Sequence, residues 1–259
     1  MSDRIRLDGK VAVVTGAAGV IGTATIRLLA ERGARIVAVD RKQQELQTAI
    51  KDLPASAQAL GLIADVTDED EIAEYVRATV DKFGAIDVFY NNAGIEGDIA
   101  PIPKYSLATF RRVIDVNVVG VFLGMKHVLP VMLKQNKGSI INTASIAGLI
   151  GSPDIAVYSA SKHAVIGLTK SAALECSTTG VRVNCVCPGL IDSRMLSAII
   201  EGRNPGNAPV PNERIVERIP ARRLGLAAEV ASVVAFLASD EASYVSGSAY
   251  TVDGGRTAG

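Results

Sequence analysis

Short apolar runs alternate with longer amphipathic segments from one end of the chain to the other. Apolar runs bounded by glycine or polar residues are typical of buried strands, and apolar positions spaced three and four apart are typical of helices. This pattern predicts strands at 11–14, 35–39, 59–63, 86–90, 139–143, 181–186 and 248–252. It predicts helices at 23–32, 43–53, 67–83, 106–117 and 227–239, an apolar run at 118–133 that extends or follows the fourth of these, and a further helix that carries Tyr158.

The alternation of strands and helices indicates the fold class. Such a chain builds an α/β fold in which helices cover both faces of a parallel sheet. We therefore predict a doubly wound parallel seven-stranded sheet of the Rossmann-like kind, formed by a single domain, 1–259. Four prolines and three glycines interrupt residues 202–225, so we expect a substrate lid at about 190–224.

Composition and charge narrow the possible partners. The 27 basic residues balance the 27 acidic ones, and no block of five like charges occurs, which argues against nucleic acid and anionic membrane. The first apolar run, 11–14, is too short for a signal peptide or a membrane span. The cysteines Cys176, Cys185 and Cys187 lack the spacing of a zinc site, and no other metal-ligand cluster is visible. We expect buried, reduced thiols, Cys185 and Cys187 on the same face, and a cytoplasmic protein.

A glycine-rich turn joins the first strand to the first helix. The sequence TGAAGVIG, which begins at Thr15, would let backbone N–H groups and a helix N-terminus approach a pyrophosphate. Asp40 ends the next strand, eighteen residues past Gly22, where an acid would bind the ribose hydroxyls of a dinucleotide. Its charge would repel a 2′-phosphate, which favours NAD over NADP. Arg41 instead favours NADP, because an arginine there could bind the 2′-phosphate. It could also be an ordinary cation on a solvated loop.

Three side chains suited to proton transfer follow the fifth predicted strand. Tyr158 and Lys162 lie four residues apart, which places them on one face of a helix, and Ser145 lies near a strand end. An ammonium group next to a phenol favours the phenolate, and the serine hydroxyl could stabilise charge on a substrate oxygen. A surface tyrosine and a solvated lysine would give the same spacing, so the interpretation depends on the other motifs occurring in order.

The ordered motifs resemble the short-chain dehydrogenase/reductase family, in its single-domain, NAD-preferring branch. They are TGAAGVIG at Thr15, DV at Asp65, NNAG at Asn91, NVVG at Asn117, Ser145, YSASK at Tyr158 and PG at Pro188. The resemblance covers about residues 7–255. It implies a catalytic tetrad in which Tyr158 is the general acid/base and Ser145 orients the substrate oxygen. Lys162 would lower the pKa of the tyrosine and bind the nicotinamide ribose, and Asn117 would hold a water that links Lys162 to solvent.

The resemblance also implies a set of residues that bind the cofactor, which is expected to be NAD. Besides Tyr158 and Lys162, these are Gly16, Gly19, Val20, Ile21, Asp40, Arg41, Asp65, Val66, Asn92, Ala93, Gly94, Pro188, Gly189, Ile191 and Ser193. Two positions depart from the family pattern. Val20 stands where the family usually has glycine, which puts close contact at this turn in doubt. Ser193 replaces a threonine that bonds the carboxamide, and it keeps the hydroxyl.

The substrate-binding residues are expected to be mostly apolar. They are Ser145, Ile146, Ala147, Tyr158, Glu96, Leu190 and Met195, which favours a hydrophobic or alicyclic alcohol. We predict an NAD-dependent oxidoreductase that interconverts a secondary alcohol and a ketone, without a metal and as a homotetramer. An NADPH-linked 3-ketoacyl-carrier reductase is an alternative that Asp40 argues against. A second alternative is a non-catalytic dinucleotide-binding regulatory protein, and the complete tetrad argues against it.

Overall fold

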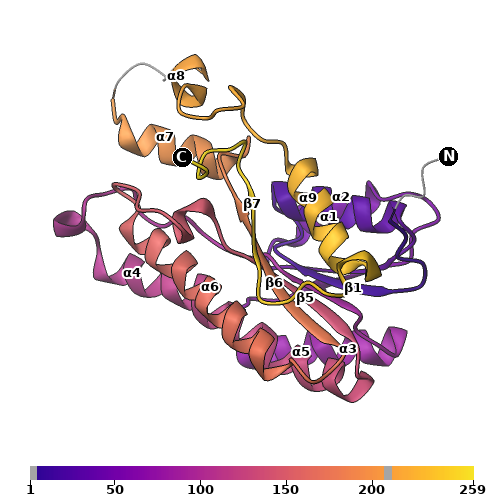
Figure 1. The fold of residues 1–259 in the computed structure, drawn as a ribbon. Coiled ribbons are helices and arrows are strands. Elements are labelled where there is room, and N and C mark those ends of the chain that lie inside the picture. Colours follow the sequence, from indigo (N-terminus) through magenta and orange to yellow (C-terminus); the bar gives the residue numbers. More distant parts are fainter. Residues whose placement is uncertain (1–4, 207–211) are drawn as a thin grey trace.

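The sheet has seven parallel strands, as predicted. The computed structural model describes residues 5–206 and 212–259, and the strands follow the order β3-β2-β1-β4-β5-β6-β7 (Figure 1). Every paired neighbour runs in the same direction. The strands are β1 (Val11–Thr15), β2 (Arg35–Asp40), β3 (Ala59–Ile63), β4 (Val88–Asn91), β5 (Gly138–Thr143), β6 (Val181–Pro188) and β7 (Ala249–Val252).

Helices cover both faces of this sheet, and each face has its own apolar core. The helices α1 (Val20–Glu31), α2 (Gln43–Lys51) and α9 (Ala227–Ala238) pack on one face. The helices α3 (Glu69–Phe83), α4 (Leu107–Ile114), α5 (Gly120–Gln135) and α6 (Ala156–Glu175) cover the other (Figure 1). Because the inner strands are covered on both sides, β1, β2 and β4 are almost continuously buried rather than alternating, whereas the edge strand β3 is partly exposed.

The strand order places the predicted site at one edge of the sheet. The chain winds outward from β1 in one direction through β2 and β3, and then in the other through β4 to β7. β1 and β4 are therefore neighbours, with Val14 opposite Tyr90. Ligands of open parallel sheets bind where the winding reverses, outside the carboxyl ends of the strands. The glycine-rich turn and the segments that follow β4, β5 and β6 all leave the sheet at this edge.

The long apolar segment predicted at 106–133 is a continuous helical run with an irregular middle. A π-helical turn, Asp115–Val119, joins α4 to α5, and it carries the buried Asn117. Leu107–Gln135 is long and apolar enough to cross a membrane by length and composition, with a mean hydropathy of 1.7. In the structure its buried side chains, among them Val121, Val128 and Met132, pack into the core on the sheet, as in a core helix.

The segment predicted as a lid carries two short helices above the sheet. These are α7 (Arg194–Arg203) and α8 (Asn212–Val216), and residues 207–211 of the predicted segment lie outside the described residues. The preceding strand differs from the prediction, because β6 continues to Pro188, which pairs with Val252. A proline is tolerated at the last position of a strand, where only one ladder hydrogen bond is lost. Cys185 and Cys187 face the same core, and all three cysteines are buried free thiols, as predicted.

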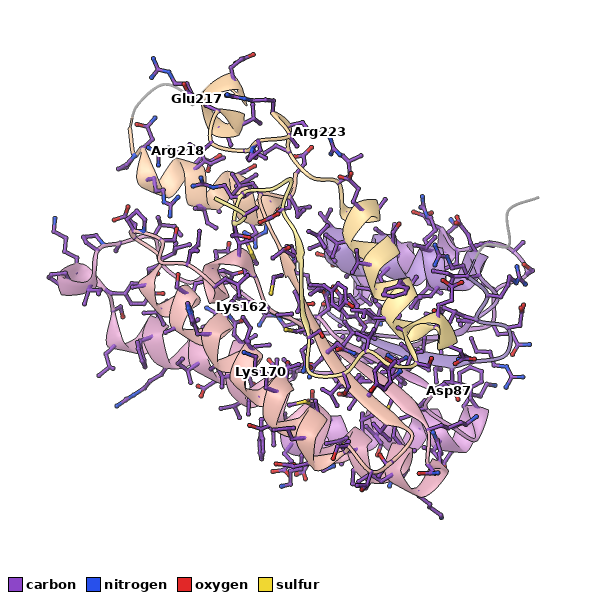
Figure 2. The ribbon with its side chains drawn as sticks, in the orientation of Figure 1. Asp87, Lys162, Lys170, Glu217, Arg218 and Arg223 are labelled. Atoms are coloured by element: carbon purple, nitrogen blue, oxygen red, sulfur yellow. The ribbon has the colours of Figure 1, made fainter. Side chains whose placement is uncertain are left out.

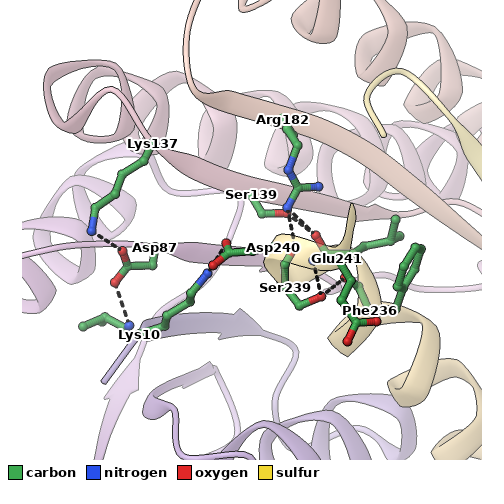
Figure 3. Close-up of polar contacts among 11 residues, drawn as sticks. Lys10, Asp87, Lys137, Ser139, Arg182, Phe236, Ser239, Asp240 and Glu241 are labelled. Carbon is green, nitrogen blue, oxygen red and sulfur yellow. Dashed lines mark hydrogen bonds and ion pairs between the residues drawn. The ribbon is translucent and has the colours of Figure 1, made fainter. Parts of the chain in front are cut away.

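A polar network fastens the end of α9 to the amino-terminal part of the central strands. Arg182 of β6 donates hydrogen bonds to the carbonyl oxygens of Leu237 at 2.8 Å and Ser239 at 3.1 Å (Figure 3). Ser139 of β5 donates to the same Leu237 oxygen at 2.8 Å. The guanidinium thus satisfies backbone oxygens where α9 ends, which would otherwise lack an intrahelical partner.

We predict that Arg182→Met lowers the thermal stability of the protein. Methionine keeps the apolar stem but leaves the Ser239 carbonyl oxygen without this donor and the Leu237 oxygen with Ser139 alone, which costs about 2 kcal/mol. For a chain of this size that corresponds to a fall in Tm of roughly 4–8 °C, measured by calorimetry. Arg77→Met is the control, because Arg77 pairs with Glu74 on the exposed face of α3 and such pairs contribute less than about 1 kcal/mol. Equal falls in Tm in the two variants would contradict the stabilising role given to Arg182.

Candidate active site

Ser145 lies between the tips of β5 and β6. It caps a short 3-10 turn, Ile146–Gly148, and its Oγ accepts a hydrogen bond from the Ala147 N–H at 3.1 Å. The same hydroxyl donates a long hydrogen bond of 3.5 Å to the Pro188 carbonyl oxygen. Such a long bond is weak, so the hydroxyl proton can turn toward another acceptor without a large loss.

Tyr158 and Lys162 lie in the first two turns of α6 and face the same volume as Ser145. Lys162 Nζ lies 5.6 Å from the centre of the Tyr158 ring, within the range of a cation–π contact. It donates a 2.8 Å hydrogen bond to the carbonyl oxygen of Thr143, the last residue of β5. Lys162 therefore lies where α6 meets the carboxyl ends of the strands (Figure 2). The three side chains that the sequence places in the tetrad come together as predicted.

The electrostatics of the pair differ from the sequence prediction. Burial raises the pKa of Tyr158 to about 12; a hydrogen bond from Ser145 works against this, whereas the negative charges of Glu96 and of a Cys187 thiolate would add to it. Burial also lowers the pKa of Lys162 to about 8. Desolvation disfavours whichever form of a group is charged, and here it outweighs the attraction between the two side chains. In the protein alone, Lys162 does not make the phenol acidic.

Asn117 anchors the loop that follows β4. Its Oδ1 accepts a hydrogen bond from the Ile95 N–H at 2.9 Å, and its Nδ2 donates to the Ile95 carbonyl oxygen at 2.9 Å. Nδ2 also donates to Ser161 Oγ of α6 at 3.0 Å. A buried amide needs such partners, and these join α6 to the loop. The water-holding role implied for Asn117 stays a prediction.

The glycine-rich turn packs closely against its own backbone and against the loop after β4 because its glycines lack side chains. Gly16 has a φ of +63°, and a Cβ atom there would lie 2.8 Å from the Cα of Ala93. A Cβ atom at Gly22 would lie 2.1 Å from the Gly16 carbonyl oxygen. Gly19 is the N-cap of α1 and supplies no capping side chain, so the N–H groups of the first turn are available to an anion. The turn therefore fits a pyrophosphate, and Val20 at 49% exposure does not block its folding.

Two acidic residues end or follow the strands beside this turn. Asp40 Oδ2 accepts from the Ala18 N–H and Oδ1 accepts from the Lys42 N–H, each at 3.0 Å. These bonds fix the carboxylate beside the turn and leave lone pairs for a ribose. Asp65 accepts from the N–H and the hydroxyl of Thr67 at 2.9 and 2.8 Å. The two residues next to them that were also predicted to bind the cofactor differ in exposure. Val66 is buried against Gly120, whereas Arg41 is exposed.

Asn92 ties the tips of three strands together behind the turn. Its amide donates to the carbonyl oxygens of Thr15 and Gly16, each at 3.1 Å, and its Oδ1 accepts from the Thr143 hydroxyl at 3.3 Å. The next residue, Ala93, donates its N–H to the Thr15 hydroxyl at 3.2 Å. Gly94 lies so close to Lys162 that a Cβ atom would come 3.4 Å from Nζ.

The segment after β6 closes the opposite side of the cleft. A Cβ atom at Gly189 would lie 2.8 Å from the Asp253 Cα, so glycine permits close packing there. Ile191 is buried and forms a parallel bridge with Gly225. Ser193 Oγ donates to the Ile191 carbonyl oxygen at 3.1 Å and accepts from the Leu196 N–H at 3.3 Å, as the N-cap of α7. Its hydroxyl therefore already has two partners.

The space beside the Tyr158 ring is apolar with one acidic group. Ala147, Ile155 and Tyr158 form a buried cluster, against which Ile99, Met195 and Ile199 pack. Ile146 and Glu96 are also nearly buried. Sequence reasoning missed Ile99, Ile155 and Ile199, because only the folded path of the loops brings them to the tyrosine. Leu190 lines another cavity of about 310 Å³, beside Arg223 and Asp253.

Comparison with known proteins places this geometry in a family. The model described as enoyl-(acyl carrier protein) reductase, one of the short-chain dehydrogenase models, matches residues 16–257. Levodione reductase of Leifsonia aquatica is 39% identical over 260 residues, covering 99% of this chain and 97% of that protein. The chain belongs to the short-chain dehydrogenase/reductase family. The family motifs named from the sequence are therefore motifs of this protein.

Other members of the short-chain dehydrogenase/reductase family are equally similar. The 3-oxoacyl-acyl-carrier-protein reductase FabG of Thermotoga maritima is 42% identical, covering 97% of this chain and 99% of that protein. Cyclohexanol dehydrogenase of Acinetobacter sp. (strain SE19) is 40% identical, with 97% and 96% covered.

Solved structures of the family have the same fold. A crystal structure of levodione reductase superposes with a TM-score of 0.94 at 39% identity, covering 98% of this chain and 99% of that chain. A structure of NAD+-bound xylitol dehydrogenase has a TM-score of 0.92 at 38% identity, covering 96% and 99%.

We predict that Gly22→Ala weakens dinucleotide binding at least about tenfold. The added methyl group would force the Gly16 carbonyl and the turn to move, and a misplaced turn loses backbone contacts to the phosphates. Isothermal titration with NAD+ measures the change in Kd, and circular dichroism checks that the variant is folded. Gly167→Ala is the matched control in α6, because a Cβ atom there meets nothing within 4 Å. Unchanged affinity in Gly22→Ala would contradict the role given to the turn.

Proposed function

We propose that the protein is an NAD-dependent oxidoreductase that interconverts a secondary alcohol and a ketone, with Tyr158 as general acid/base. The observation that carries this proposal is the convergence of Ser145, Tyr158 and Lys162 beside an apolar cluster, at the edge of the sheet that carries the glycine-rich turn. Relatives named levodione reductase and cyclohexanol dehydrogenase support a hydrophobic, alicyclic substrate for this chain as well.

Each member of the site has a distinct part in the proposed reaction. When an alcohol is oxidised, the Tyr158 oxygen accepts the hydroxyl proton, and it returns a proton to the ketone oxygen in the reverse direction. The Ser145 hydroxyl exchanges its long bond to Pro188 for a bond to the substrate oxygen. Lys162 holds its charge against the Tyr158 ring through its bond to Thr143. Ala147 and Met195 exclude water from the reacting oxygen.

A nicotinamide dinucleotide would be held by the turn from Gly16 to Gly22, by Asp40 at the ribose and by Lys162 at the second ribose. When bound, it supplies the carrier that takes or gives the hydride. The preference for NAD over NADP is proposed on Asp40, because its carboxylate is fixed beside the turn by the Ala18 and Lys42 N–H groups. A 2′-phosphate at that position would face a negative charge.

We predict that Tyr158→Phe lowers kcat by about 10²–10⁴-fold while the Kd for NAD+ stays within about twofold. Phenylalanine removes only the oxygen that carries the proton. The rates are measured with a panel of secondary alcohols at the nicotinamide absorbance, and Kd by calorimetry. Tyr75→Phe is the matched control, because the Tyr75 hydroxyl is buried in α3 and has no hydrogen-bond partner among the described residues. Normal turnover in Tyr158→Phe would refute the assignment.

We predict that initial rates with NADH exceed those with NADPH by at least about tenfold, and that Asp40→Ala narrows this ratio. Removing the carboxylate removes the repulsion of the 2′-phosphate. Arg41→Ala tests the opposite possibility, since an arginine that binds the phosphate would make NADPH use fall when it is lost. A wild-type preference for NADPH would overturn the NAD assignment and favour the 3-ketoacyl-carrier reductase, the activity named for the Thermotoga relative.

A further inference from the structure

The helix α7 is fastened over Tyr158 by an arginine at each end. Arg194, its first residue, donates to both carboxylate oxygens of Glu96, at 2.8 and 3.2 Å. Arg203, its last residue, donates to Ser152 Oγ at 2.9 Å and to the Pro153 carbonyl oxygen at 2.6 Å. Met195 and Ile199, between these ends, pack against the cluster that contains Tyr158. The two arginines therefore hold the same helix, but only Arg194 contacts a charged group of the site.

Glu96 is an unusual group for this place. Its side chain is 11% exposed, at the edge of an otherwise apolar cluster, whereas that of Arg194 is 72% exposed. A carboxylate that is nearly buried needs a compensating charge, and a two-pronged arginine contact is the strongest form of such compensation. The ion pair thus differs from a surface pair between two solvated side chains, which contributes little.

We propose that Arg194 is a positioning residue: it holds the Glu96 carboxylate and cancels its charge toward the Tyr158 hydroxyl. This inference rests on the proposed function of Tyr158. The inference adds a residue of α7 to the groups that govern proton transfer. It also explains how the site tolerates an acidic side chain that would otherwise oppose ionisation of the general base.

Few charged groups act on the Tyr158 hydroxyl, and Glu96 is one of them. Glu96 acts to raise the pKa of Tyr158, after the larger effect of burial. Cys187 of β6 would act in the same sense, but its hydrogen bond with Cys185 and its burial raise the pKa of its thiol, so it stays neutral. Lys162 of α6 supplies a positive charge, with Nζ 5.6 Å from the centre of the ring. Arg194 of α7 acts through Glu96 alone, since its bonds are to that carboxylate.

The test compares Arg194→Met with Arg203→Met across pH. Both substitutions loosen α7 and keep the apolar stem, but only the first leaves Glu96 without its partner. We expect Arg194→Met to move the pH profile of kcat/KM for alcohol oxidation upward by roughly half a unit, a modest shift because the guanidinium is exposed. Arg203→Met should raise KM and leave the profile in place. Arg194→Lys should restore part of the shift.

A double substitution separates the charge effect from a general loosening of the helix. With Glu96→Gln in place, Arg194→Met should cause no further shift of the profile, because no carboxylate remains to be compensated. A shift that persists in the Glu96→Gln background would overturn the proposal. Equal shifts in Arg194→Met and Arg203→Met would also overturn it.

A second readout does not depend on turnover. Ultraviolet difference titration of tyrosinate with NAD+ present, for each variant against the same variant carrying Tyr158→Phe, reads the ionisation of Tyr158 directly. The midpoint should rise in Arg194→Met and stay fixed in Arg203→Met, and an unchanged midpoint in Arg194→Met would refute the proposal. A wild-type protein that oxidises no alcohol would instead count against the proposed function, and the titration would still decide the role of Arg194.

Discussion

The side chains at the carboxyl ends of the strands are arranged around one nearly buried ammonium group, that of Lys162. Lys162 is 2% exposed, and a charge in such a place is costly unless it has partners. It has two, the carbonyl oxygen at the tip of β5 and the face of the Tyr158 ring. Burial nevertheless brings the pKa of Lys162 down to about 8, so most of the charge is retained at neutral pH. This cation therefore lies at the meeting point of the β5 tip and the Tyr158 phenol.

Small residues and one amide make that position possible. Gly94 lies against both groups: a Cβ atom there would come 3.3 Å from Asn117 Oδ1 and 3.4 Å from Lys162 Nζ. The loop that carries Gly94 is held by Asn117, whose amide bonds both backbone groups of Ile95. Asn117 lies in the π-helical turn between α4 and α5, where the wider turn is a common device for placing a functional side chain. The same amide reaches Ser161 of α6, so the helix with Lys162 and the loop facing it are fixed together.

Local patterns were sufficient to predict the sheet and the residues that meet at its edge. Continuous apolar runs identify parallel strands, and the alternation with helices leaves few ways to connect them. Tyr158, Lys162 and Ser145 could be found because helical spacing and a strand end are local features. The pairing of Glu96 with Arg194 could not be found, because 98 residues separate the two and neither is part of a local motif. The π-helical turn was missed for a related reason, since helical spacing looks continuous across it.

The raised pKa of Tyr158 escaped prediction because burial is a tertiary property, and it has a consequence for the order of events. The phenol has that pKa of about 12 with Lys162 already beside its ring, so the protein's own cation does not bring it into the neutral range. Further positive charge has to approach the phenol before it can act as a base near neutral pH. On the proposed function, an oxidised nicotinamide would bring such a charge, so the phenol would ionise more readily in the loaded site than in the protein alone.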